Sequence, residues 1–143
     1  MNTQADKSRI RDAATVIVLR DRATTPRILM GQRGANAAFM PNKFVFPGGA
    51  VDAGDHHVPL ATPLSAPNDT RLCDDSAPGL GHALAVAAIR ELFEETGQVL
   101  GIPGAWAGTP GPDWCSFAAT GHCPHAAPLH FVFRALTPPG RPR

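Results

Sequence analysis

The sequence predicts a single domain that combines β-strands with helices, an α/β protein. Its 143 residues are enough to bury a core of their own. Short runs of β-branched and apolar residues fill the first third of the chain, and the clearest helical period follows in residues 82–96. Fifteen Pro and fourteen Gly indicate that much of the remainder is loop.

Three strands are expected before the helix. Residues 13–19 are a β-branched run typical of a buried strand. Residues 27–33 follow a polar turn, so the two runs are expected to pair as a hairpin. Residues 43–46 form a short third strand, which Pro47, Gly48 and Gly49 are expected to end before residues 50–52 continue extended.

Residues 82–96 have the spacing of an amphipathic helix. The apolar residues that recur at helical intervals are Leu84, Ala85, Ala88, Ile89, Leu92 and Phe93. Gly97 follows directly and is a good helix stop, because glycine adopts the left-handed conformation needed there.

The other segments are less regular. Residues 55–81 are rich in Pro, Ala, Ser, Thr and Asp and show no period, so we expect a mobile cover outside the core. Residues 113–119 are expected to form a short helix with Asp113 as its N-cap. Residues 129–136 are apolar and β-prone, which predicts a last strand.

Charge and cysteine content narrow the class of partner. The net charge is +1 without a basic or acidic block, so neither nucleic acid nor an anionic membrane is an expected partner. The longest apolar run, residues 83–89, is too short to span a bilayer. Three cysteines without a pairing pattern predict free thiols and a cytoplasmic location.

Three carboxylates share one face of the predicted helix. Glu91, Glu94 and Glu95 stand at i, i+3 and i+4. Like charges at this spacing destabilise a bare helix, which favours a cation between them. Carboxylate oxygens suit Mg²⁺ or Mn²⁺, and Arg90 can orient one carboxylate through a bidentate pair. From the helix alone, a solvated acidic surface is the commoner explanation.

A segment upstream of the helix favours the metal site over the solvated surface. Residues 46–55 followed by residues 90–97 resemble the Nudix box, whose pattern is Gly, five residues, Glu, seven residues, then Arg-Glu-apolar-any-Glu-Glu-any-Gly-apolar. Gly49 matches the first position, and residues 90–97 match the second half without a gap. The resemblance to the Nudix hydrolase family covers residues 12–97.

The sequence departs from the pattern in three places. Asp55 stands where the family has Glu, and Gln98 stands where it has an apolar residue. The spacer between Asp55 and Arg90 holds 34 residues, where the pattern has seven. Such an interrupted box is similar to that of the peroxisomal coenzyme A diphosphatase subgroup and its bacterial relatives. Residues 30–33 and 39–49 also resemble that subgroup.

The resemblance implies an α/β/α sandwich with a mixed sheet. One Nudix-like domain would then occupy residues 1–143, with a long insertion over about residues 56–81. Less regular structure is expected after the box helix than the family usually has, so we expect the C-terminal part of the domain to be missing. An incomplete sheet would expose an apolar patch, which makes a homo-oligomer an open alternative.

The resemblance also implies a metal-dependent hydrolase. Its substrate would be a small molecule of nucleotide type, a nucleoside diphosphate linked to another moiety such as coenzyme A or an acyl derivative. Glu91, Glu94 and Glu95 would hold Mg²⁺ or Mn²⁺ and, with Arg90, form the catalytic set. A metal-bound or Glu-activated water would attack phosphorus, and Glu91 is our first choice of base.

Four further residues complete the implied site. Gly48 and Gly49 would let the backbone approach the phosphates closely, because they lack a Cβ. Arg33 could reach a substrate phosphate, although a surface arginine at a strand end is equally expected. Asp55, one methylene shorter than Glu, could still hold Arg90 in place.

Two other functions share this fold. One is a binding or regulatory domain that no longer catalyses, which the altered Asp55 and the long insertion would favour. The other is a prenyl diphosphate isomerase, which would need a catalytic cysteine near the diphosphate. Cys73 lies in the insertion and is a poor candidate for that role.

Two clusters near the end of the chain are interpreted as structural. A loop gathers Cys115, His122, Cys123 and His125, but their spacing fits no common zinc pattern, so plain loop residues are favoured. Trp106 and Trp114 could stack on a ring of the substrate, but core packing is the commoner role for such residues.

Overall fold

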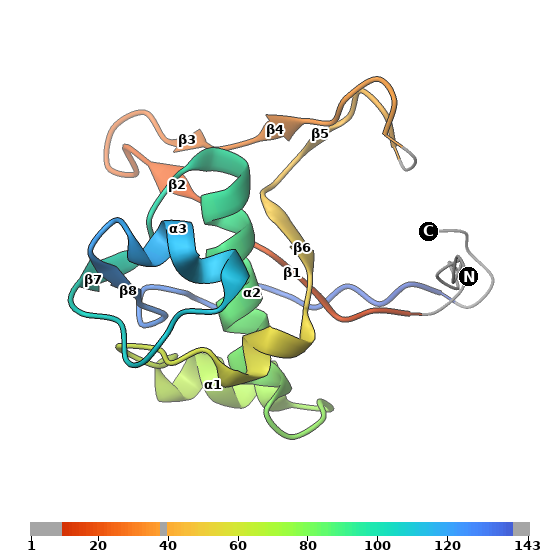
Figure 1. Cartoon of the computed structure of the whole chain (residues 1–143). Helices are drawn as coiled ribbons and strands as arrows, with labels where there is room; N and C mark the ends of the chain where they lie inside the picture. Colours follow the sequence, from red (N-terminus) through yellow and green to blue (C-terminus); the bar gives the residue numbers. More distant parts are fainter. Residues whose placement is uncertain (1–9, 38–39, 139–143) are drawn as a thin grey trace, which may run out of the picture.

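A computed structural model describes residues 10–37 and 40–138. Helix α2 (Leu80–Thr96) runs through the centre of the molecule, with α1 (Ala66–Cys73) at its lower end in Figure 1. The short strands lie above it and on both sides of it (Figure 1). Within the described ranges, no helix is both long and apolar enough to cross a membrane.

Helix α2 is the centre of the core. It confirms the predicted helix and begins two residues earlier than expected, at Leu80. Burial is broader than the predicted stripe, because Ala83, Val86 and Ala87 are also fully buried. The small alanine side chains let neighbouring segments come close on more than one side. The helix ends at Gly97, whose φ of 71° is left-handed and whose N–H donates to the Phe93 carbonyl.

Aromatic side chains from the C-terminal half pack against α2. Phe117 is 1% exposed, and its ring lies edge-on to Phe93 and Trp114 at centroid distances of 5.2 Å each. Trp114 is 4% exposed, and Trp106 packs against the same cluster. The interpretation of both tryptophans as core residues is therefore confirmed.

Within residues 10–37 and 40–138, the strands form four two-stranded antiparallel pairs. These are β1 (Ala13–Thr15) with β6 (Gly48–Ala50), β2 (Leu19–Arg20) with β3 (Arg27–Ile28), β4 (Gly31–Gln32) with β5 (Phe44–Val45), and β7 (Gly101–Pro103) with β8 (His122–Pro124). One parallel bridge joins Thr62 to His125. The predicted combination of strands and helices is confirmed, with shorter strands than the sequence patterns suggest.

The first hairpin is confirmed, but two details of the N-terminal strands were predicted wrongly. The expected strands divide into β1 with β2 and β3 with β4, because the pairing partner changes within each: β1 pairs with β6, β2 with β3, and β4 with β5. Gly48 and Gly49 do not end a strand. They form most of β6, where a Cβ on Gly48 would lie 2.7 Å from the Thr15 Cα, so only glycine allows this approach.

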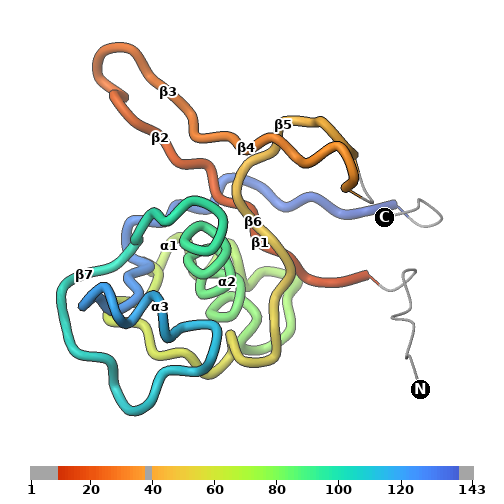
Figure 2. The backbone as a smooth tube through the Cα atoms, turned by 45° about the horizontal axis from the view of Figure 1, so that its top comes forward, coloured from red at the N-terminus to blue at the C-terminus, as the bar shows by residue number. Residues whose placement is uncertain are grey.

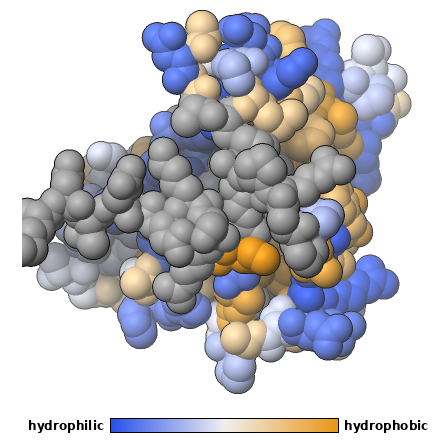
Figure 3. All heavy atoms as spheres, turned by 90° about the vertical axis from the view of Figure 1, so that its right-hand side faces the viewer, coloured by the Kyte–Doolittle hydropathy of each residue, from blue (hydrophilic) through white to orange (hydrophobic). Residues whose placement is uncertain are grey.

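Residues 13–19 are also less buried than predicted. Ile17 is 39% and Leu19 46% exposed, and Ile28 across the hairpin is 50% exposed. The β2–β3 hairpin extends away from the helices in Figure 2, so its outer face is open in the described part of the chain. On the face shown in Figure 3, hydrophobic residues likewise lie in the open among hydrophilic ones.

The insertion contains regular structure and reaches the core, which corrects the expectation of a cover outside the core. It contains α1 and follows on from η1 (Ala53–His57), whose last two residues overlap it. Val58 is part of the buried core, and Leu60 and Leu64 pack against it. These side chains reach the core from extended backbone at irregular intervals, so no helical or strand period reveals them in the sequence.

The predicted strand over residues 129–136 is not formed. The segment has no regular secondary structure, because it contacts α1 where a strand would need a neighbouring strand. The Phe131 N–H donates to Asn68 Oδ1 at 2.9 Å. Arg134 Nη2 donates to the Leu72 carbonyl and to Ser76 Oγ, each at 2.8 Å. The C-terminal segment therefore packs against the insertion through these hydrogen bonds.

Two features after α2 differ from expectation. The helix predicted over residues 113–119 is found one residue earlier, as η2 (Pro112–Trp114) followed by α3 (Cys115–Ala118). Asp113 is not the N-cap, because Gly111 precedes η2 and Trp114 precedes α3. The β7–β8 pair was missed, since its strands contain Gly and Pro residues that normally indicate loops.

Candidate active site

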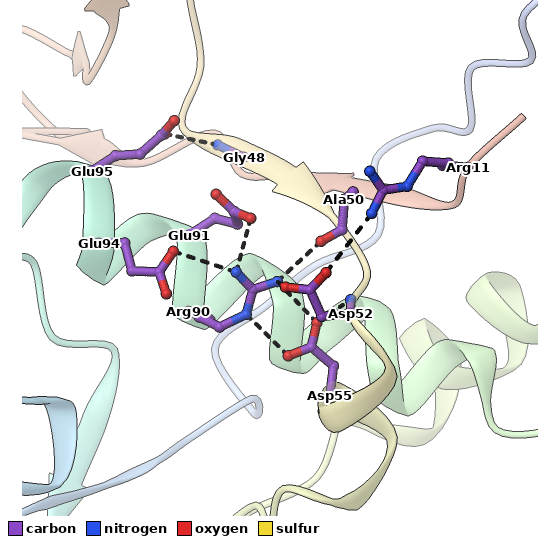
Figure 4. A network of polar contacts seen from close by, with 9 residues as sticks. All are labelled: Arg11, Gly48, Ala50, Asp52, Asp55, Arg90, Glu91, Glu94 and Glu95. Carbon is purple, nitrogen blue, oxygen red and sulfur yellow. Dashed lines mark hydrogen bonds and ion pairs between the residues drawn. The ribbon is translucent and has the colours of Figure 1, made fainter. Parts of the chain in front are cut away.

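The residues of the motif meet where β6, η1 and α2 come together (Figure 4). Helix α2 supplies Arg90 and the three glutamates, and η1 supplies Asp55. Strand β6 passes beside the helix and contributes backbone groups of Gly48 and Ala50. Residues separated by more than 30 positions in the sequence are thereby brought into one cluster.

Arg90 lies at the centre of this cluster. It is 5% exposed, and each of its five N–H groups makes a hydrogen bond. Two go to the Asp55 carboxylate at 3.0 Å, one to the Ala50 carbonyl at 3.0 Å, one to Glu91 Oε1 at 2.9 Å and one to Glu94 Oε2 at 3.3 Å. Asp55 above all, and Glu91 as well, raise the pKa of Arg90 further although burial opposes this shift, so the guanidinium stays charged.

Asp55 is the principal partner of Arg90. Its side chain is 2% exposed and takes a bidentate pair from Nε and Nη2. Asp55 Oδ2 also accepts the Asp52 N–H at 2.8 Å, and the Asp55 N–H donates to the Asp52 carbonyl at 3.0 Å. The tight η1 turn thus brings the shorter aspartate within reach of Arg90.

The three glutamates differ in exposure and in their contacts. The Glu91 side chain is 17% exposed and that of Glu94 is 41% exposed, and both accept from Arg90 Nη1. Glu95 Oε2 instead accepts the Gly48 N–H at 3.1 Å. Desolvation raises the pKa of Glu94 above its ordinary value, although Arg90 opposes this shift.

The donor chemistry of the glutamates fits a divalent cation, but the cluster is not a preformed metal site. In the ranges 10–37 and 40–138, no three His, Cys, Asp or Glu residues are grouped so that they could hold one ion. The three carboxylates are nonetheless hard oxygen donors on one side of α2. Gly49 makes room for one of them, because a Cβ there would come within 2.6 Å of Glu91 Oε2.

Arg33 is placed apart from this cluster. It follows β4 and is half-buried, and its Nε makes no hydrogen bond within the described residues. No hydrogen bond or ion pair joins it to the carboxylates in the part of the chain that the structure describes. The structure therefore brings together Gly48, Gly49 and the motif residues of α2 with Asp55, but not Arg33.

Sequence reasoning missed Asp52 and Arg11. Asp52 Oδ2 lies 3.4 Å from Arg90 Nη2, and Asp52 Oδ1 lies 3.8 Å from Arg11 Nη2 (Figure 4). One signal was available in the sequence: Asp52 stands three residues before Asp55, which is the spacing of a helix capping box.

The cysteines show no arrangement suited to catalysis. All three are free, as predicted. Desolvation and the neighbouring Asp69 raise the pKa of Cys73, which keeps its thiol protonated and weakly nucleophilic. Cys115 Sγ donates to the Gly111 carbonyl and Cys123 Sγ to that of Ala105, on different segments. The isomerase alternative is therefore not favoured.

Comparison with known proteins finds similarity to Nudix hydrolases. No protein-family model matches the chain. It is 40% identical over 96 residues to "Putative nudix hydrolase 7" of Caenorhabditis elegans. The matched residues are 67% of this chain and 24% of that protein. The crystal structure of a NUDIX hydrolase from Alicyclobacillus acidocaldarius matches with a TM-score of 0.69 and 28% identity, over 94% of this chain and 65% of the other. The chain thus spans about a quarter of the first relative and about two thirds of the second.

Proposed function

We propose that this chain, which has the fold of a Nudix hydrolase, hydrolyses a diphosphate bond with divalent cations held by Glu91, Glu94 and Glu95. The single observation that carries the proposal is the Arg90 cluster. Residues from both halves of the sequence motif converge on one buried guanidinium. Both similar proteins are described as Nudix hydrolases, putatively in one case, which supports the same activity.

The Arg90 cluster argues against a merely solvated acidic surface. Burying a guanidinium and a carboxylate costs several kcal/mol per ion before their attraction is counted. A helix that needs only a polar outer face would leave Arg90 exposed. Here the fold satisfies all five of its donors and aligns two glutamates in doing so. Such an arrangement is expected where the position of the carboxylates matters.

The protein's own residues suggest a division of roles. Bound cations would neutralise the diphosphate and favour attack by water. Arg90 and Asp55 are positioning residues, since their polar atoms face each other and not solvent. Glu91 is the proposed general base: its Oε1 accepts from Arg90, which leaves Oε2 to take the proton of the attacking water. The bond between phosphorus and the leaving phosphate oxygen then breaks.

The proposed substrate is a nucleoside diphosphate linked to another moiety. The interrupted motif supports coenzyme A or an acyl derivative as the finer choice, with Mg²⁺ or Mn²⁺ as the cation. Gly48 and Gly49 would allow close approach of the phosphates, and Arg33, which follows β4, would contact an outer phosphate. The free thiols support a cytoplasmic location.

A substrate panel tests this proposal. Purified protein is incubated with ADP-ribose, dinucleoside polyphosphates, coenzyme A and acetyl-coenzyme A, each with Mg²⁺, Mn²⁺ or EDTA, and products are separated by chromatography. We expect cation-dependent release of two phosphate-bearing products from at least one compound, with the largest rate for the coenzyme A compounds. Tight binding of a panel compound without any product would instead support a binding domain that has lost catalysis.

A further inference from the structure

We propose that Asp52 is a positioning residue that acts through Arg90, an inference that rests on the proposed function. Asp52 is not one of the specified positions of the sequence motif. Yet its Oδ2 lies 3.4 Å from Arg90 Nη2, and its backbone N–H donates to Asp55 Oδ2 at 2.8 Å. It therefore contacts both members of the buried ion pair.

Arg90 is held from two sides. Asp55, the Ala50 carbonyl and Asp52 face Nε and Nη2, whereas Glu91 and Glu94 face Nη1 (Figure 4). The guanidinium is planar and rigid, so weaker hydrogen bonding and attraction on the Asp55 side let it move toward the two glutamates. With less negative charge at Asp52, Arg90 would bind Glu91 and Glu94 more tightly and turn them away from a cation and the attacking water.

The effect is expected to be moderate. The Asp52 side chain is 54% exposed, so solvent screens its attraction to Arg90. It also shares its charge with Arg11, whose Nη2 lies 3.8 Å from Asp52 Oδ1. Asp52 therefore adjusts the position of Arg90, whereas the buried Asp55 anchors it.

A structural role for Asp52 makes a different prediction. Asp52 precedes η1 at the N-cap position, where Asn serves about as well as Asp. Asn also has the same shape and keeps the backbone N–H that donates to Asp55. If Asp52 merely capped η1, D52N would behave like the wild type. If its charge positions Arg90, D52N is impaired and D52E is not, because the exposed side chain has room for another methylene.

The first experiment measures kcat, KM and the thermal midpoint of D52N and D52E with the substrate found by the panel. D21N is the matched control, because Asp21 is 45% exposed and forms surface ion pairs with Arg20 and Arg27. We expect kcat of D52N to fall about fivefold, or about 1 kcal/mol in barrier height. KM and the midpoint should stay near those of the wild type. D52E should stay within about twofold of wild-type kcat, and D21N should match the wild type.

A second measurement does not depend on turnover. Hydrogen exchange of the Arg90 Nε–H is followed by ¹⁵N NMR in the cation-free protein, where this proton is bonded to Asp55 Oδ1. D52N should exchange several-fold faster and D21N at the wild-type rate. If D52N exchanges faster but the wild type cleaves no diphosphate, the positioning role is supported and the proposed function is contradicted. Wild-type kcat or exchange in D52N would overturn the positioning role, as would a fall in kcat matched by a lower midpoint.

Discussion

Replacing Gly49 with alanine should impair catalysis while leaving the fold intact. Gly49 lies in β6 directly against the Glu91 carboxylate. An added Cβ would stand 2.6 Å from Glu91 Oε2, where ordinary contacts begin at 3.4 Å. The backbone of Gly49 is not in the left-handed region, so alanine adds no strain of its own. The carboxylate must therefore move by about 1 Å, since it is the end of a flexible side chain.

The size of the two effects can be estimated from this displacement. A misplacement of about 1 Å in a catalytic group can cost about a hundredfold in rate. The new Glu91 rotamer should cost about 1 kcal/mol of stability. Most of this is offset, because replacing glycine by alanine reduces the entropy of the unfolded chain by a similar free energy. We therefore expect kcat to fall about a hundredfold with little change in the free energy of unfolding.

Steady-state kinetics and urea unfolding of G49A test this estimate. G31A is the control, because Gly31 lies in β4 and a Cβ there would meet nothing within 4 Å. G31A should match the wild type in both measurements. Wild-type kcat in G49A would show that the position of Glu91 does not govern turnover, and the assignment of Glu91 would be wrong.

Three further predictions follow from the same structure. D55N should lower the free energy of unfolding, measured in urea, by about 3 kcal/mol, because it leaves the buried Arg90 charge without its main partner. A loss under about 1 kcal/mol would show that Asp55 is not the anchor of Arg90. Burial raises the pKa of Glu94 above its ordinary 4.5, so folding disfavours the ionised carboxylate. The folded protein therefore loses stability as the pH rises through the raised pKa and Glu94 ionises. In the cation-free protein at pH 7, E94Q should therefore unfold at an equal or higher temperature than the wild type. Well below pH 4.5 the two should unfold at the same temperature. A less stable E94Q at pH 7 would contradict the upward direction of the Glu94 pKa shift. Limited proteolysis should cut the turn of the exposed β2–β3 hairpin before residues 56–81, because the insertion packs on the core. Early cuts inside the insertion would show that it is mobile.

Regular periodicity was a reliable guide where packing follows it. The spacing in α2 predicted both the helix and the shared face of the glutamates, because each depends only on local geometry. The hairpin of β2 and β3 was predicted for the same reason, from two β-branched runs around a polar turn. The link between Asp55 and Arg90 came from the resemblance, since no local pattern joins residues 35 positions apart.

The errors arose where tertiary contacts determine structure. Residues 129–136 have strand-like composition, but their polar contacts go to α1. Val58 reaches the core from a segment without periodicity, so the insertion was wrongly expected to lie outside the core. Glycines that normally stop a strand form β6, because the close approach of β1 excludes a side chain at Gly48. Each case depends on a neighbour that is distant in the sequence.

The central claim is that the glutamates of α2 bind the cation needed to cleave a diphosphate. Its most direct test is a Mg²⁺ titration of product release by the wild type, E94Q and E95Q, with circular dichroism to verify that each variant is folded. Release of product by the wild type should rise from zero to saturation with Mg²⁺. Both variants should stay folded and lose orders of magnitude in kcat, as the loss of a metal ligand implies. Wild-type rates in either folded variant, or cleavage that persists in EDTA, would contradict the claim.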